Sequence, residues 1–148
     1  MKTKSMNSID YQIKLNKSVH WERTRDLTNE RKKDIREAYK KTVASLGETS
    51  KYMSKSGLIT MTINSPAKRF YVDDIECKKI IVMAHRGFEI ALKSKNKRAM
   101  YEEILRRFEI KIKETPKRSI YEIIDEIIYS EAPCFYVELS YIQNRKIL

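Results

Sequence analysis

The chain is poor in residues that break regular structure and in residues that form cross-links. It has three glycines and three prolines in 148 residues, which argues against a turn-rich β protein and favours long regular elements. Its two cysteines, Cys77 and Cys134, form no CxxC pair, so we expect ordinary thiols in a reduced compartment. No apolar run approaches the roughly 18 residues that a membrane-spanning helix needs. The N-terminus also lacks the apolar segment of a signal peptide, so we expect neither membrane insertion nor signal-directed secretion.

Arrangements of residues that carry catalysis or bind metals are also scarce. The two histidines, His20 and His85, have no metal-ligand spacing, and the chain contains no Gly-rich phosphate loop and no nucleophile elbow. The acidic group of Asp73, Asp74 and Glu76 could form a carboxylate metal site. A helix N-cap at Asp73 with Glu76 three residues later explains the same residues. We therefore expect no catalytic residues, no metal, no cofactor and no small-molecule substrate.

One stretch of the chain occurs twice, 65 positions apart. Residues 65–72 read SPAKRFYV and residues 130–137 read SEAPCFYV, in which Ser, Ala, Phe, Tyr and Val are identical. The same spacing pairs similar residues upstream without a gap, for example Glu37 with Glu102. A short match can arise by chance, but the matching flanks favour a tandem duplication of one small unit.

This duplication divides the chain into an N-terminal arm (1–27), unit one (28–87), a linker (88–96) and unit two (97–148). Each unit is near the size at which a lone domain becomes marginally stable, so we expect the two units to share a core. The arm is polar, basic and only weakly periodic, and we expect it to be disordered when the chain is free. The Lys-rich linker is expected to carry a further helical turn.

The first two helices of each unit are predicted from apolar spacing. In unit one the first helix begins near Thr28 and ends at Gly47, and its counterpart covers about 97–113. The second helix of unit two has isoleucines at helical spacing and a capping box formed by Ser119 and Glu122. In unit one the equivalent residues alternate like a strand, but the repeat spacing predicts a helix.

After each second helix the chain is predicted to leave the helical conformation. Pro66 and Pro133 disfavour helix at the residue before them, and the following Phe-Tyr-Val is a short extended piece of good β-formers. Alternation along such a piece points Phe and Val inward and Tyr outward, and the two pieces could pair as a small ribbon. Asp73 then caps a third helix that runs to about Arg86. The predicted fold is mainly α, a tandem pseudo-repeat of two three-helix units with an extended FYV segment between the second and third helices.

The charge balance favours a polyanionic partner. Lys and Arg number 31 against 20 acids, which gives a net charge of +11, while acids outnumber bases in residues 119–148. The alternative is solvated charge that keeps a helical protein soluble. The candidate contacts to nucleic acid or another anion lie off the apolar stripes or beside the motif: Lys33, Arg36, Lys40, Lys41, Lys68, Arg69, Lys78, Lys79, Arg98, Arg106 and Arg107. The candidate subunit or partner contacts are Trp21, Tyr71 and Tyr136.

The motif at residues 65–72, preceded by an amphipathic helix and followed by an acid-capped one, resembles a group of small basic proteins. These proteins are encoded by Bacteroidetes tailed phages and prophages, with crAss-like phages as one candidate source. Residues 98–104 and 119–137 look like the second half of that group, and the likeness covers roughly residues 28–148. Cys134 stands where the first copy has Arg69, so we do not expect an anion contact there in unit two. The resemblance implies a phage context and no particular reaction.

The sequence therefore predicts a non-enzymatic phage structural or assembly protein. The leading hypothesis is a virion component, a ring or connector subunit near packaged DNA at the head–tail junction. Its partners would be other phage structural proteins, further copies of the chain and the DNA backbone, first in the host cytoplasm and then in the virion. The alternatives are a helix-turn-helix-like DNA-binding regulator or architectural protein, and a small anti-host or nuclease-associated factor.

Overall fold

The computed structural model describes the backbone of residues 2–148 and the side chains from residue 22 onward. It confirms that the fold is mainly α, and the described residues form no β-strand longer than a single bridge. The elements in chain order are α1 (Lys2–Leu46), the 3-10 helix η1 (Gly47–Tyr52), α2 (Lys55–Ile63), α3 (Asp74–His85), α4 (Lys95–Glu114), α5 (Ile120–Ile128) and α6 (Leu139–Asn144).

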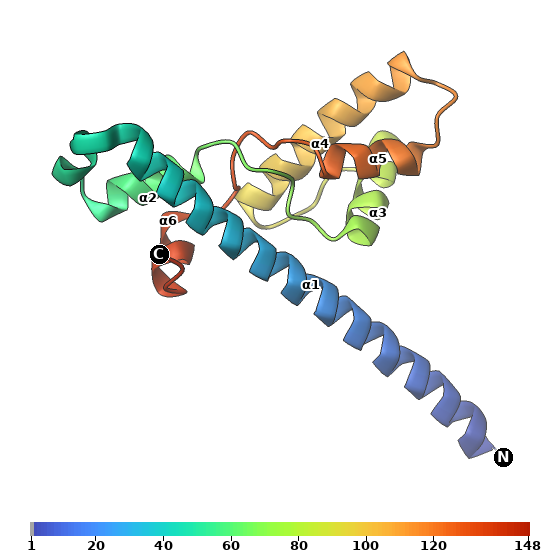
Figure 1. The fold of residues 1–148 in the computed structure, drawn as a ribbon. Helices are drawn as coiled ribbons and strands as arrows, with labels where there is room; N and C mark the ends of the chain where they lie inside the picture. Colours follow the sequence, from blue (N-terminus) through green and yellow to red (C-terminus); the bar gives the residue numbers. More distant parts are fainter. Residues whose placement is uncertain (1) are drawn as a thin grey trace.

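The first helix is much longer than the sequence suggested. α1 is one continuous helix of 45 residues, and it passes through the boundary predicted at Thr28. The predicted start of the first helix near Thr28 is therefore wrong, while the expected disorder of residues 1–27 in the free chain stays a prediction. Figure 1 shows the N-terminal half of α1 projecting away from the other helices, while the C-terminal half lies along them. Gly47, with φ of +57°, ends the helix as expected, because this left-handed conformation favours glycine.

Several predicted helix ends are confirmed, and others are wrong. Residues 57–63 lie in α2, so the helix inferred from the repeat spacing is confirmed. Asp73 caps α3 by accepting a hydrogen bond from the Glu76 backbone N–H at 3.1 Å. Ser119 precedes α5, but its hydroxyl makes no capping bond. The linker forms no helical turn of its own, because residues 88–94 are irregular and α4 already begins at Lys95.

The two copies of the motif meet backbone to backbone. Ala67 and Ala132 form an antiparallel bridge in which each N–H donates to the other carbonyl at 2.9 Å. The Phe70 N–H donates to the Ile128 carbonyl at 2.9 Å, and the Phe135 N–H donates to the Ile63 carbonyl at 3.0 Å. Each of these bonds has a counterpart 65 positions along the chain. The segments thus pair through the alanines, and the FYV residues themselves do not form the predicted ribbon.

The two motif segments cross at the Ala67–Ala132 bridge. Because of this crossing, the helix that follows each segment packs against helices of the other half of the chain. α3 packs against α4 and α5, and α6 packs against α2. Figure 1 shows α3 beside α5 at one end of the body and α6 beside α1 and α2 at the other. The two halves are therefore interlocked, and the core that they share is predicted correctly.

The core itself is built from isoleucines and aromatic side chains. Phe70, Phe108 and Ile35 are fully buried. The four aromatic residues of the FYV segments stack across the crossing, Phe70 with Tyr136 at 6.2 Å and Tyr71 with Phe135 at 6.0 Å between ring centroids. Burying side chains of this size contributes about 1.5–3 kcal/mol each, so the contact between the two motif segments is a major source of stability.

Candidate nucleic-acid interface

Tyr71 ties the motif to α1 through a buried polar contact. The residue is only 6% exposed, and its hydroxyl donates to Asp34 Oδ2 at 2.5 Å. Burial and this hydrogen bond raise the pKa of Tyr71 well above its usual range. The prediction that Tyr71 points outward is wrong, because the segment belongs to no sheet whose alternation would turn it to solvent. Tyr71 is thus a core residue, and no surface is left on it for a partner.

The two other predicted partner contacts differ from Tyr71. Tyr136 is half-buried, stacks on Phe70, and has a φ of +54°, an uncommon conformation for an aromatic residue. Burial raises its pKa to about 12. The side chain of Trp21 lies outside the described side chains, so its predicted contact stays a prediction.

The two basic residues of the motif form ion pairs with acidic residues of α1. Lys68 Nζ lies 2.7 Å from Glu37 Oε2 and 3.6 Å from Asp34 Oδ1, which fastens the motif to α1. The hydrogen bond from Lys68 lowers the pKa of Glu37. The Arg69 side chain is only 12% exposed and reaches Glu30 Oε2 at 3.3 Å. Neither cation is arranged as a free contact for nucleic acid.

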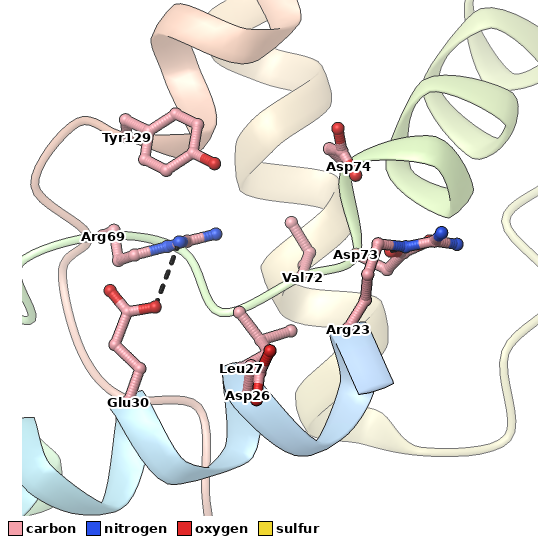
Figure 2. A pocket seen from close by; sticks show the side chains of 9 residues that line it. All are labelled: Arg23, Asp26, Leu27, Glu30, Arg69, Val72, Asp73, Asp74 and Tyr129. Atoms are coloured by element: carbon pink, nitrogen blue, oxygen red, sulfur yellow. Dashed lines mark hydrogen bonds and ion pairs between the residues drawn. The ribbon is translucent and has the colours of Figure 1, made fainter. Parts of the chain in front are cut away.

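Figure 2 shows how Arg69 is enclosed. Its guanidinium lies 4.4 Å from the centroid of the Tyr129 ring, on the wall of a cavity of about 210 Å³. Glu30 approaches from α1, and Arg23 forms an ion pair with the capping residue Asp73 at 2.8 Å on the far side. Acids outnumber bases among the lining residues, so this cavity does not favour an anion. Arg69 instead links α1, the motif and the end of α5.

Four more of the predicted contacts also have internal partners. Lys78 pairs with Asp125 at 3.0 Å and joins α3 to α5. Arg106 and Arg107 both donate to Glu103, and their hydrogen bonds lower the pKa of that carboxyl. Arg98 donates to the Leu92 carbonyl and so closes the linker onto α4. These cations have partners within the fold, and sequence alone could not distinguish them from free ones.

The remaining cations lie on the exposed face of α1 and directly after α6. Lys33, Arg36 and Lys40 are exposed on α1 at spacings of three and four, which places them on one face. Arg36 Nε donates to the Ile147 carbonyl at 3.1 Å and so brings the end of the chain beside this face. We call the set of Lys33, Arg36, Lys40, Arg145 and Lys146 the α1/α6 basic surface. None of its side chains forms an ion pair with any carboxylate among the described side chains.

An aromatic residue of α6, Tyr141, holds one arginine of α1 and one arginine that follows α6. The Arg31 guanidinium lies 4.9 Å from the centroid of the Tyr141 ring and donates to the Tyr141 hydroxyl at 2.8 Å. Arg145 lies over the same ring at 5.5 Å. One ring thus holds two guanidinium groups close together without an acid between them. Arg31 and Tyr141 were missed from the sequence, because α1 and α6 are over 90 positions apart and only the fold joins them.

Lys41 and Lys79 complete the predicted set. Lys41 is exposed next to Lys40, and together with Lys33 it further lowers the pKa of Glu37. Lys79 is exposed on α3, away from α1. Among the described side chains neither forms an ion pair, so both stay available as contacts.

The described residues contain no group of three or more potential ligands that could hold a metal ion. His85 Nδ1 lies 3.7 Å from Glu109 Oε1, and its ring packs edge-on against Phe108. Cys77 is fully buried, which raises the pKa of its thiol to about 12, and Cys134 is half-buried with its pKa also raised by burial. No helix among the described residues is long and apolar enough to cross a membrane.

Comparison of the chain with protein-family models, with curated proteins and with solved structures finds no match.

Proposed function

We propose that this chain is a non-enzymatic phage structural or assembly protein that contacts the DNA backbone through the α1/α6 basic surface. Within a virion it would serve as a ring or connector subunit near packaged DNA at the head–tail junction. The phage context comes from the resemblance of the repeated motif. The observation that carries the DNA contact is the set of five exposed cations that form no ion pair among the described side chains, while the other candidate cations are mostly paired within the fold.

The composition of this surface suits phosphate contact better than base reading. Arginine and lysine side chains at helical spacing can each neutralise one phosphate, and such contacts carry no sequence information. A regulator of the helix-turn-helix type needs two consecutive helices packed together and a recognition helix free for the major groove. Here α3 packs against α4 and α5, and its counterpart α6 has only six residues. These features support an architectural contact over sequence-specific recognition.

The length of α1 supports a role in assembly. At 1.5 Å per residue its 45 residues span about 68 Å, more than the body alone requires. Figure 1 shows that the N-terminal half extends beyond every other element. A projecting helix of this kind is available to neighbouring subunits, either copies of this chain or other phage structural proteins.

The DNA contact is tested by titrating a fluorescent duplex of arbitrary sequence with the full chain at several salt concentrations. The test variant replaces Lys33, Arg36 and Lys40 by Gln. A matched control replaces three exposed lysines around the start of α4 by Gln: Lys93, Lys95 and Lys97. We expect the test variant to lower the slope of log K against log salt by about 2.7, since each lost phosphate contact removes about 0.9. The control should keep the wild-type slope. Equal losses in both variants would mean diffuse charge attraction and would refute a defined surface.

The assembly role is tested by measuring the mass of the full chain by light scattering without DNA at low and high salt. A large species that resists salt supports a virion subunit. A monomer or dimer that binds one duplex sequence far more tightly than others would overturn the proposal in favour of a regulator.

A further inference from the structure

A second surface, far from the basic one along the chain, combines exposed apolar side chains with basic ones. A hollow of about 440 Å³ lies between α3 and the start of α5. We call it the α3/α5 groove, and its lining is Ile75, Lys78, Lys79, Val82, Met83, Arg86 and Tyr121. Ile75 is 46% exposed, Met83 42% and Tyr121 54%, which is unusual for apolar side chains that lie next to one another.

The other half of the molecule has the same junction with different chemistry. α2 and α5 begin 65 positions apart, and so do α3 and α6, so the junction of α6 with α2 corresponds to that of α3 with α5. At the equivalent positions Ser140 replaces Ile75, Gln143 replaces Lys78, and Ser56 replaces Tyr121. The Gln143 side-chain amide donates to the Ser56 hydroxyl at 3.2 Å and bridges that junction.

Comparison of the two junctions shows that the packing of α3 against α5 does not require apolar residues at the surface. At the α6 junction the three compared positions are polar, Gln143 bridges to Ser56, and the helices still pack. The isoleucine and tyrosine of the α3/α5 groove therefore add exposed apolar area that the fold does not need. Exposed apolar area of this kind, with a polar rim, is typical of a protein–protein contact.

The charges around the groove indicate what its occupant carries. Every charged side chain in the lining is basic. Lys78 is held by Asp125 at 3.0 Å, whereas Lys79 and Arg86 are exposed and form no ion pair among the described side chains. Acidic groups on a partner would pair with these two residues while its apolar side chains cover Ile75 and Tyr121.

We propose that the α3/α5 groove binds an amphipathic helix of a partner protein, with an apolar stripe flanked by Asp and Glu. A second copy of this chain fits less well, because residues 1–20 of its projecting helix contain four lysines and one aspartate. The same sign of charge would repel that segment from the groove. This proposal does not depend on the DNA contact, since the two surfaces share no residue.

The test uses two model peptides of about 18 residues, long enough to form a helix. Both carry Leu at spacings of three and four; one has Glu and Ala at the remaining positions and the other has Lys and Ala. Fluorescence anisotropy of the labelled peptides measures binding to the full chain. We expect saturable binding of the Glu peptide and at least about tenfold weaker binding of the Lys peptide, which corresponds to about 1.4 kcal/mol.

Two groove variants and one control make the result specific. The double change Ile75→Ser and Tyr121→Ser introduces the residues of the other half and should weaken binding of the Glu peptide at least about tenfold. The double change Lys79→Glu and Arg86→Glu should reverse the preference between the peptides. The control changes two exposed apolar residues elsewhere, Tyr52→Ser and Ile110→Ser, and should leave binding unchanged.

Three results would overturn the proposal. The Glu and Lys peptides could bind equally, which would show no charge selectivity. The Ile75→Ser and Tyr121→Ser variant could bind as well as the wild type, which would place the site elsewhere. The chain could also form a dimer that this variant abolishes, which would make the occupant a second copy. Circular dichroism of every variant establishes that the fold is intact before binding is compared.

Discussion

The contact between Tyr71 and Asp34 makes the sharpest prediction about stability. Both residues are nearly buried, at 6% and 7% exposed, and the hydroxyl donates to the carboxylate at 2.5 Å. The change Tyr71→Phe removes the donor and leaves the ring in place. Among the described side chains, Asp34 then keeps Lys68, whose Nζ lies 3.6 Å from Oδ1. We expect the loss of this one hydroxyl group to lower the stability of the fold more than Tyr→Phe at any other described tyrosine.

The expected loss follows from the carboxylate that is left behind. A buried acceptor that loses its partner costs about 1–3 kcal/mol. For a chain of this size each kcal/mol lowers Tm by about 2–4 °C, so we expect a decrease of about 2–12 °C. The measurement is urea unfolding followed by circular dichroism, supported by thermal melts. Tyr121→Phe is the matched control, since that residue is 54% exposed, and it should change stability by less than about 0.5 kcal/mol.

A double-mutant cycle separates the contact from other effects of the change. Asp34→Ala alone removes the acceptor, and the combination with Tyr71→Phe removes both groups. If the contact acts as described, the double variant loses less than the sum of the single losses, with a coupling of at least about 0.5 kcal/mol. A stability of Tyr71→Phe equal to that of the wild type, together with zero coupling, would refute this account of how the motif is held to α1.

Two further predictions concern titration and thiol reactivity. Burial raises the pKa of Tyr136 and of Cys77 to about 12, so the stability that these neutral groups contribute is present in full below the unfolded values of 10.0 and 9.0. This stability is lost as the pH rises through about 12. Phenolate absorbance should show tyrosines that titrate late and ionise together with the loss of helical circular dichroism. Full ionisation of the tyrosines near pH 10 in a folded chain would contradict this prediction. In the native protein a thiol reagent should modify the half-buried Cys134 before the fully buried Cys77. The change Cys134→Ser should remove the fast phase of the reaction. Equal reaction rates for both thiols would refute the prediction.

The repeat spacing predicted structure where local pattern misled. Residues 57–63 alternate like a strand, yet they form α2, whose buried residues are Leu58, Ile59, Thr62 and Ile63. Those four lie one and four positions apart, which places them on one side of a helix. The isoleucines of α5 show the same buried face more clearly. The helix at α2 could therefore be predicted from its counterpart in the second half of the sequence.

The sequence failed where the answer depends on contacts between distant segments. The local signal at Asp73 predicts that a helix begins, but it does not say which body α3 packs against. In the same way, Lys68 and Arg69 read as surface cations until α1 brings Glu37 and Glu30 to them. The first helix was predicted to begin only near Thr28 because the apolar periodicity before it is weak, and periodicity reports burial of a face, not the helical backbone itself.

The exchange of α3 and α6 between the halves determines how the molecule can be taken apart. A cut in the irregular stretch 88–94 would separate the chain in sequence but not in space, since each fragment would carry a helix that completes the other. Neither fragment would fold alone, whereas the two mixed together should recover the whole structure without a peptide bond between them. If the two fragments reassemble, the peptide link between α3 and α4 is not needed for the fold. It would then keep the two halves, which have different surfaces, in a one-to-one ratio.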